Sequence, residues 1–134
     1  MERSRRDAEF REAFPRLHER AYQAAFRLLG DRVAAEDAAQ EALTRAYVHW
    51  SRLDERREGW VVTTTFNIVL DGFRRQKRWE AFRTRYLAEL DRNADATAEL
   101  RALCRRGPVT LLYAARDTQH NQALVLAEYL ARHR

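Results

Sequence analysis

The stretch DGFRRQKRWEAFRTRYLAEL, residues 71–90, contains no residue after Gly72 that would end a helix. It has no proline and no serine, and its apolar residues recur at three- and four-residue steps. These residues are Trp79, Phe82, Tyr86, Leu87 and Leu90. The stretch therefore predicts a helix rather than a linker between the two parts of the chain that it joins.

The segment WVVTTTFNIVLDGFRR, residues 60–75, overlaps the start of this stretch and is ambiguous, because its β-branched run favours a strand by propensity alone. A helical interpretation, however, gathers one apolar face. Its members are Val62, Phe66, Val69, Leu70 and Phe73. We predict one continuous or slightly kinked helix from about Gly59 to Leu90.

Residues 10–50 predict two further helices with a tight joint between them. In the first helix the apolar residues Phe10, Phe14, Leu17, Ala21, Ala24 and Leu28 recur with helical spacing. Pro15 is expected to delay its regular start. Gly30 followed by Asp31 is typical of a C-terminal glycine next to an N-cap. The second helix spans roughly 32–50, and SRLDERREG, residues 51–59, is expected to be a polar connection.

Beyond residues 91–95 the chain predicts a short helix, a strand and a last helix. The short helix ends near Arg106, because Gly107-Pro108 follows it. The run VTLLY, residues 109–113, is short, apolar and bounded by turn residues, so we predict a strand. A lone strand needs partners for its backbone N–H and C=O groups. These could come from residues 61–65, if they form a strand rather than a helix, or from a second copy of the chain. Failing both, part of a sheet-containing fold is missing. The final helix is expected from Thr118, capped by Asp117 or Thr118.

The charge balance allows an anionic partner without requiring one. Lys plus Arg number 25 and Asp plus Glu 20, so the formal net charge is +5, and Lys77 is the single lysine. Cys104 is the single cysteine, which excludes an intrachain disulfide and a four-cysteine zinc site, and we expect it to be a small buried residue. Without an apolar leader or a membrane-length apolar run, we expect a cytoplasmic protein with no membrane partner.

Residues 10–78 carry an ordered series of motifs: a leucine-rich helix, the Gly30-Asp31 joint, the acidic segment AEDAAQEA, a tryptophan, and a helix with Asn67, Asp71, Arg74 and Arg75. The strings RLLGDRVAAEDAAQEALTRAYVHW and GWVVTTTFNIVLDGFRRQKR resemble region 2 of bacterial extracytoplasmic-function (ECF) RNA polymerase sigma factors. The resemblance implies a helical domain over residues 1–78 that binds core RNA polymerase and the −10 promoter element in transcription initiation.

The resemblance also implies roles for particular residues. The second helix would bind the clamp coiled coil of the polymerase through Asp37, Gln40, Glu41 and Arg45. The third would hold the melted −10 strand through Trp60, Asn67, Arg74 and Arg75, with Lys77 and Arg78 as further phosphate contacts. Arginines neutralise phosphates, an amide reads a base edge and an aromatic ring stacks on an unpaired base. A core position for Trp60 and an orienting role for Asp71 are the structural alternatives.

Sigma factors of this group continue into region 4, which reads the −35 element, but the residues after position 78 do not carry its pattern. We therefore expect weak promoter recognition. Residues 79–134 resemble another family instead. The strings WEAFRTRYLAEL and GPVTLLYAARDTQHNQALVLAEYL are similar to the C-terminal half of YeaO-like proteins, small uncharacterised bacterial proteins with an α/β fold. This resemblance implies a partial YeaO-like unit over residues 79–134, with VTLLY as an inner strand.

A polar cluster follows this strand: Thr110, Tyr113, Arg116, Asp117, His120 and Asn121. An anion-binding or hydrolytic site is one interpretation, because the N-terminus of a helix offers free N–H groups. The simpler interpretation is that Asp117 caps the last helix and the others make surface contacts.

Taken together, the sequence predicts a mainly α chain. A sigma region 2-like helical bundle continues by a long helix into a partial α/β unit with one strand (109–113) and a C-terminal helix. We expect a transcription initiation module without catalysis, metal or cofactor. Its expected partners are core polymerase, −10 promoter DNA, an anti-sigma factor and, through the strand, a second copy. Two alternatives stay open: an uncharacterised YeaO-like cytosolic protein, with or without enzymatic activity, and a gene fusion without function.

Overall fold

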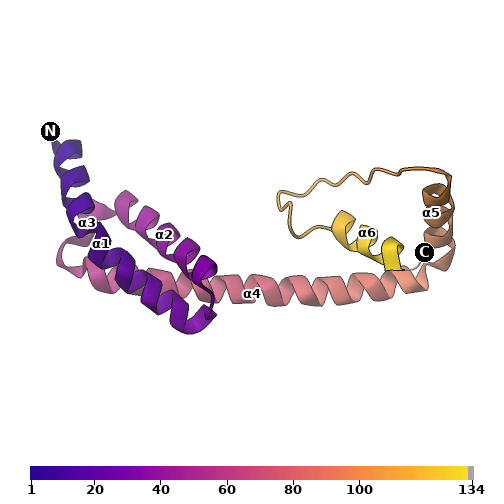
Figure 1. Ribbon diagram of the computed structural model, residues 1–134, viewed down its shortest axis with the longest axis horizontal. Coiled ribbons are helices and arrows are strands. Elements are labelled where there is room, and N and C mark those ends of the chain that lie inside the picture. The colour runs from indigo at the N-terminus through magenta and orange to yellow at the C-terminus, as the bar shows by residue number, and fades with distance from the viewer. Residues whose placement is uncertain (133–134) are drawn as a thin grey trace. The chain divides into compact units, whose positions relative to one another are not determined.

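The computed structural model describes residues 1–132 (Figure 1). Its helical elements are α1 (Glu2–Leu29), α2 (Arg32–Val48), α3 (Trp50–Leu53), the 3-10 turn η1 (Asp54–Arg56), α4 (Arg57–Arg92), α5 (Ala94–Arg106) and α6 (Gln122–Arg132). The chain forms two compact units, Met1–Arg74 and Arg75–Arg134, called here the first and the second unit. The prediction of a mainly α chain is confirmed.

The long helix predicted from about Gly59 to Leu90 is confirmed as α4, which runs without a break for 36 residues. Both compact units include part of it, and the division between them falls after Arg74. The domain boundary predicted after residue 78 rests on where the two sequence resemblances meet, and it stays a prediction.

Small side chains form most of the core of the first unit, where α1 and α2 lie side by side (Figure 1). α1 contributes Leu17, Ala21 and Ala25. α2 opposes them with a nearly continuous buried face of Ala35, Ala38, Ala39, Ala42, Leu43 and Ala46. Because alanine side chains are short, the two backbones can approach closely and still pack without voids. Trp50, which is 1% exposed, supplies the largest buried side chain of this core.

The joint between α1 and α2 is the one predicted from Gly30 and Asp31. Gly30 has φ 64°, in the left-handed region that glycine adopts readily, and its N–H donates to the Phe26 carbonyl at 2.8 Å. Asp31 caps α2 by accepting the Ala34 N–H at 2.8 Å. Pro15, by contrast, does not delay α1, which begins at Glu2 and continues through it. Arg11, four residues earlier, is exposed, so water can satisfy the carbonyl that proline leaves without a donor.

The apolar face predicted for the first part of α4 is largely wrong. The helix buries Val61, Thr65, Ile68 and Val69, whereas Phe66, Leu70 and Phe73 are 37–46% exposed. Thr65 tolerates burial because its Oγ1 donates to the Val61 carbonyl at 2.7 Å. Thr65 is therefore a core residue, because its hydroxyl is hydrogen-bonded within the helix. As a result, the buried side of α4 is rotated from the side that the apolar residues alone indicate.

The expected polar connection at residues 51–59 is mostly helical. Leu53 is buried, and the chain bends at Asp54, whose φ of 44° is unusual for a residue other than glycine. Arg57, at the start of α4, lies over the Trp50 ring at 3.9 Å and its Nη2 is 3.4 Å from Oε2 of Glu9 on α1. These contacts fix the start of α4 against the core of the first unit.

The second unit is formed by the end of α4, α5, the segment 107–121 and α6. Tyr129 of α6 is buried and its hydroxyl donates to Asp91 Oδ1 at 2.8 Å. Arg83 Nε donates to Glu128 Oε2 at 3.2 Å, and a second hydrogen bond joins its Nη2 to Oε1 of the same carboxylate. This two-bond fork fastens α6 to α4. Cys104, expected to be buried, is exposed, because it borders a cavity instead of packed side chains.

The last helix begins later than predicted. α6 starts at Gln122, and Asn121 caps it by accepting the Leu124 N–H at 3.1 Å. Neither Asp117 nor Thr118 is therefore the cap. Asn121 is buried, and its side-chain amide also donates to the Asp117 carbonyl at 3.1 Å. That second hydrogen bond ties the cap to the preceding turn.

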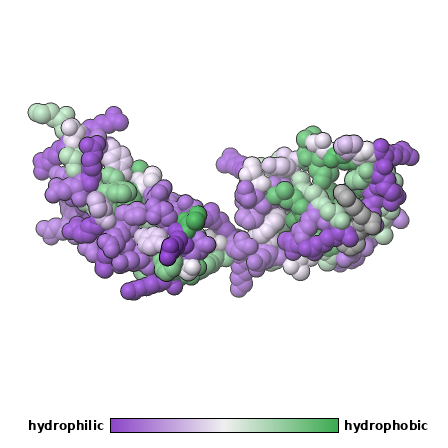
Figure 2. All heavy atoms as spheres, in the orientation of Figure 1, coloured by the Kyte–Doolittle hydropathy of each residue, from purple (hydrophilic) through white to green (hydrophobic). Residues whose placement is uncertain are grey.

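The predicted strand at 109–113, and with it the partial α/β unit, is wrong: residues 1–132 contain no β-strand. The segment is extended, but a strand needs a neighbour to complete its ladder, and residues 61–65 are part of α4. Leu112 is 91% exposed, and Figure 2 shows hydrophobic side chains on the visible face of the second unit. A homodimer through this segment stays a prediction.

None of the described helices combines the length and the apolar content that crossing a bilayer requires.

Candidate functional site

The outward face of α2 carries the four residues predicted to bind polymerase. Asp37, Gln40, Glu41 and Arg45 are all exposed, while the alanines on the opposite side of the helix are buried. Arg45 Nη2 and Glu41 Oε1 form an ion pair at 2.5 Å, and both side chains are about half exposed. The Asp37 carboxylate has no hydrogen bond or ion pair with another residue in the described part of the chain. The structure thus brings these four side chains together on one accessible surface.

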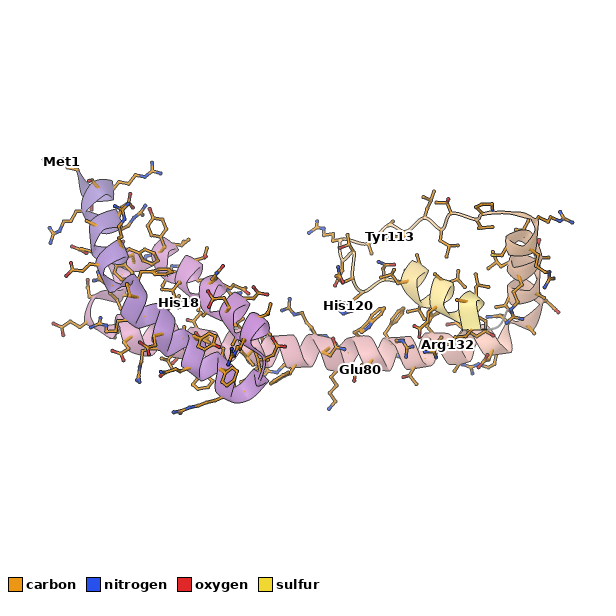
Figure 3. The ribbon with its side chains drawn as sticks, in the orientation of Figure 1. Met1, His18, Glu80, Tyr113, His120 and Arg132 are labelled. Atoms are coloured by element: carbon orange, nitrogen blue, oxygen red, sulfur yellow. The ribbon has the colours of Figure 1, made fainter. Side chains whose placement is uncertain are left out.

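Glu36 attaches this face to α1. Its Oε1 is 3.0 Å from Nε2 of His18, which Figure 3 labels on α1, and it accepts the Gln40 side-chain amide at 3.0 Å. The hydrogen bond from Gln40, followed by the contact with His18, holds the pKa of Glu36 below its usual range. The Gln40 side chain is therefore oriented before any partner binds.

A cavity of about 870 Å³ lies beside Trp60 in the first unit. It is lined by one acidic, two cationic and several aromatic, apolar or small residues: His49, Arg52, Leu53, Glu55, Arg56, Gly59, Trp60 and Thr63. The rings of His49 and Trp60 have centroids 5.8 Å apart and are tilted by 59°. Trp60 also packs against the core of the unit and is half-buried. It is therefore at once part of the core and a wall of the cavity.

Sequence reasoning missed His49, Arg52 and Arg56 as members of this site. A segment interpreted as a polar connection gives no side-chain direction, so its charges could not be assigned to a surface. The available signal was the four-residue step from Arg52 to Arg56 and again to Trp60, which a helical interpretation of residues 50–60 would have placed together.

Trp60, Asn67 and Arg74 are seven residues apart on α4 and so lie along one side of that helix. Asn67 and Arg74 are exposed. Arg74 Nη1 is 2.9 Å from Asp71 Oδ1, and both side chains are more than half exposed. Such an exposed pair stabilises the fold little. Its effect is instead to orient the guanidinium of Arg74, which is the orienting role expected from the sequence as an alternative for Asp71.

Arg75, Lys77 and Arg78 follow on α4 and belong to the second unit. All three side chains are exposed. Within residues 1–132 they form no ion pair, so their charged groups are free to bind an anionic ligand such as a phosphate.

The predicted polar cluster of the second unit comes together only in part. Asp117 Oδ1 accepts the N–H groups of Gln119 at 2.8 Å and His120 at 3.0 Å, and its Oδ2 is 3.1 Å from His120 Nδ1. The backbone bond from Gln119, followed by the His120 side chain, holds the pKa of Asp117 below its usual range. The His120 ring lies 4.9 Å from that of Trp79, near α4 (Figure 3).

The remaining members of this cluster take other positions. Asn121 caps α6, while Thr110, Tyr113 and Arg116 are exposed in the extended segment and form no hydrogen bond or ion pair with other described residues. This arrangement is a hydrogen-bonded turn at Asp117 followed by the Asn121 cap, so the simpler interpretation is wrong in assigning the cap to Asp117. No group of three metal-ligating side chains occurs in residues 1–132.

The fold and these surfaces define a mainly helical protein with exposed polar and cationic groups. The sequence profile described as the inactive DUF488-N3 subclade matches residues 14–133, and the chain belongs to that family. The expectation of a YeaO-like protein is thereby confirmed at the level of the family.

Two curated proteins are similar to parts of the chain. The uncharacterized protein YeaO of Escherichia coli (strain K12) is 42% identical over 52 residues, which are 39% of this chain and 45% of YeaO. The ECF RNA polymerase sigma factor SigW of Bacillus subtilis (strain 168) is 38% identical over 61 residues, which are 44% of this chain and 33% of SigW. The chain thus spans less than half the length of either relative. No solved structure matches it.

Proposed function

We propose that the first unit is a sigma region 2-like module that binds the clamp coiled coil of core RNA polymerase and the single-stranded −10 promoter element. The observation that carries this proposal is the side of α4 with Trp60, Asn67 and Arg74 next to a cavity with two more arginines. The partial similarity to SigW supports the same assignment.

Polymerase would bind the outward face of α2. A charged coiled coil needs complementary side chains that are exposed and already oriented, and Gln40, Glu41 and Arg45 are each held by a neighbour on the same helix. Asp37 offers a carboxylate with no partner among the described residues. Because the opposite face of α2 is alanine packed on α1, a partner can bind without disturbing the core.

The DNA strand would follow α4. An unpaired base would enter the cavity and stack on Trp60, a contact worth about 1–3 kcal/mol per base. Arg52, Arg56 and Arg74 would neutralise neighbouring phosphates, and the Asn67 amide would contact a base edge. Arg75, Lys77 and Arg78 would add phosphate contacts, and their contribution can be measured separately from that of Arg74.

We propose that this activity is binding without catalysis. The matched subclade is described as inactive, which favours a binding role over an enzymatic one. The Asp117–His120 pair in the second unit favours the alternative, a YeaO-like protein with a hydrolytic or phosphate-handling site. That alternative is supported about as well by similarity as the sigma-like assignment.

Retention on immobilised core RNA polymerase tests the proposal, because neither the YeaO-like alternative nor a fusion without function provides for it. Specific, saturable retention of the chain supports the sigma-like module. Absence of retention removes it.

A further inference from the structure

A second cavity, of about 650 Å³, lies wholly within the second unit between α5, the extended segment and α6. Arg101, Cys104 and Arg105 line it from α5, Val109 and Leu111 from the segment, and Leu130 from α6. Its volume falls within the range of roughly 300–1,000 Å³ typical of small-molecule sites. It involves none of the residues that we propose to bind polymerase or DNA.

The polar groups of this cavity are cationic. Among residues 1–132, Arg101 and Arg105 line it and no acidic residue does. Arg101 Nε is buried and has no hydrogen-bond partner among the described residues. The Arg101 guanidinium lies 5.5 Å from the centre of the Tyr129 ring, which helps to hold it at the cavity.

Two carboxylates on the neighbouring helices α6 and α4 are already engaged. Glu128 binds Arg83 and Arg132, and Asp91 accepts the hydroxyl of Tyr129. Neither Arg101 nor Arg105 forms an ion pair within residues 1–132. Because two guanidinium groups without a counter-charge among the described residues line the same cavity, the site favours a ligand with an anionic group.

We propose that this cavity binds a small amphipathic anion. Its carboxylate or phosphate head would accept hydrogen bonds from Arg101 and Arg105, whose forked guanidinium groups match such heads. Its apolar tail would lie against Val109, Leu111 and Leu130. Both parts are required, because the cationic groups are confined to α5 while the other walls are apolar.

Cys104 provides the measurement, since it is the single cysteine and it lines this cavity. The rate of its alkylation by N-ethylmaleimide, an uncharged reagent, is followed in decanoate, decyl phosphate, decanol, acetate and inorganic phosphate, with the amphiphiles below their micelle concentrations. Only free protein reacts, so decanoate or decyl phosphate at ten times its dissociation constant should slow alkylation about tenfold. Equal protection by decanol, or by acetate or phosphate, would overturn the proposal, as would no protection at all.

Two variants test the arginines directly. Arg101→Gln and Arg105→Gln should each weaken protection by the anionic amphiphiles, whereas Arg85→Gln, an exposed arginine of α4 outside the cavity, should not. Circular dichroism verifies that each variant retains its helices. Folded Arg101→Gln protein that is protected as well as the unchanged chain would contradict the assignment of the head group, and the ligand comparison on the unchanged chain remains decisive if a variant does not fold.

Discussion

His49 and Trp60 hold their rings 5.8 Å apart, one at the end of α2 and the other in the first turn of α4, beside the cavity of the first unit. Because Trp60 also packs on the core, its ring cannot turn freely. A stacking surface that is already fixed loses little conformational freedom when a base binds to it.

Trp60→Ala should therefore weaken binding of a −10-like single strand. Loss of one stacked base is worth about 1–3 kcal/mol, or roughly 5- to 150-fold in affinity. Fluorescence anisotropy measures it, with Trp60→Phe expected to retain most of the affinity. Trp79→Ala, a half-buried tryptophan of the second unit, is the matched control. If both alanine variants bind alike, Trp60 is not a stacking platform.

Arg74→Ala and Arg75→Ala should lower the salt dependence of the same binding. Each phosphate contact with single-stranded DNA contributes about 0.7 to the slope of log affinity against log salt concentration. Each variant should thus reduce that slope by about 0.7, whereas Arg85→Ala on the same helix should leave it unchanged. Parallel lines for all four proteins would show that the arginines do not contact phosphates.

Acid should destabilise the second unit through Glu128. The hydrogen bonds from Arg83, followed by the charge of Arg132, hold the pKa of Glu128 below its usual range. A lowered carboxyl pKa stabilises the folded state above the ordinary value of about 4.3 and ceases to do so as pH falls through the lowered one. Glu128→Gln should thus lower the thermal midpoint at pH 7, and this difference should shrink as the pH falls below the ordinary carboxyl value of about 4.3. A difference that is constant with pH would indicate packing rather than charge.

Leu17→Ala should destabilise the first unit strongly. Leu17 is fully buried in the alanine-rich core, and removing a buried leucine costs about 2–5 kcal/mol. Leu28→Ala, at a position 41% exposed on the same helix, should cost much less. Chemical denaturation followed by circular dichroism compares the two, and equal losses would contradict the described core.

Local signals in the sequence were sufficient for most of the helices. Gly30 and Asp31 define a cap by their own backbone and side-chain chemistry, and the absence of a breaker in 71–90 allowed one helix to continue through it. The exposed residues of α2 followed from the alanine spacing. These features depend on residues a few positions apart, so the sequence alone was enough to predict them.

The features that depend on tertiary partners were not predictable in the same way. The run 109–113 has strand propensity, but a strand also requires a neighbour, and no described segment provides one. The buried stripe of α4 includes Thr65, whose hydroxyl is satisfied within the helix. Arg52, Arg56 and Trp60 line one cavity at four-residue steps, but residues 51–59 were interpreted as a polar connection, so this helical spacing was not used.

The affinity of the chain for immobilised core RNA polymerase tests the central claim most directly. Biolayer interferometry would compare the unchanged chain with the triple variant Asp37→Ala, Gln40→Ala, Glu41→Ala. The control triple Glu12→Ala, Glu19→Ala, Gln23→Ala also removes two carboxylates and one amide, but from exposed positions on α1. We predict saturable binding of the unchanged chain and the control, and at least about tenfold weaker binding of the α2 variant, as expected when more than about 1.4 kcal/mol of contacts is lost. No saturable binding, or equal loss in both triples, would contradict the account.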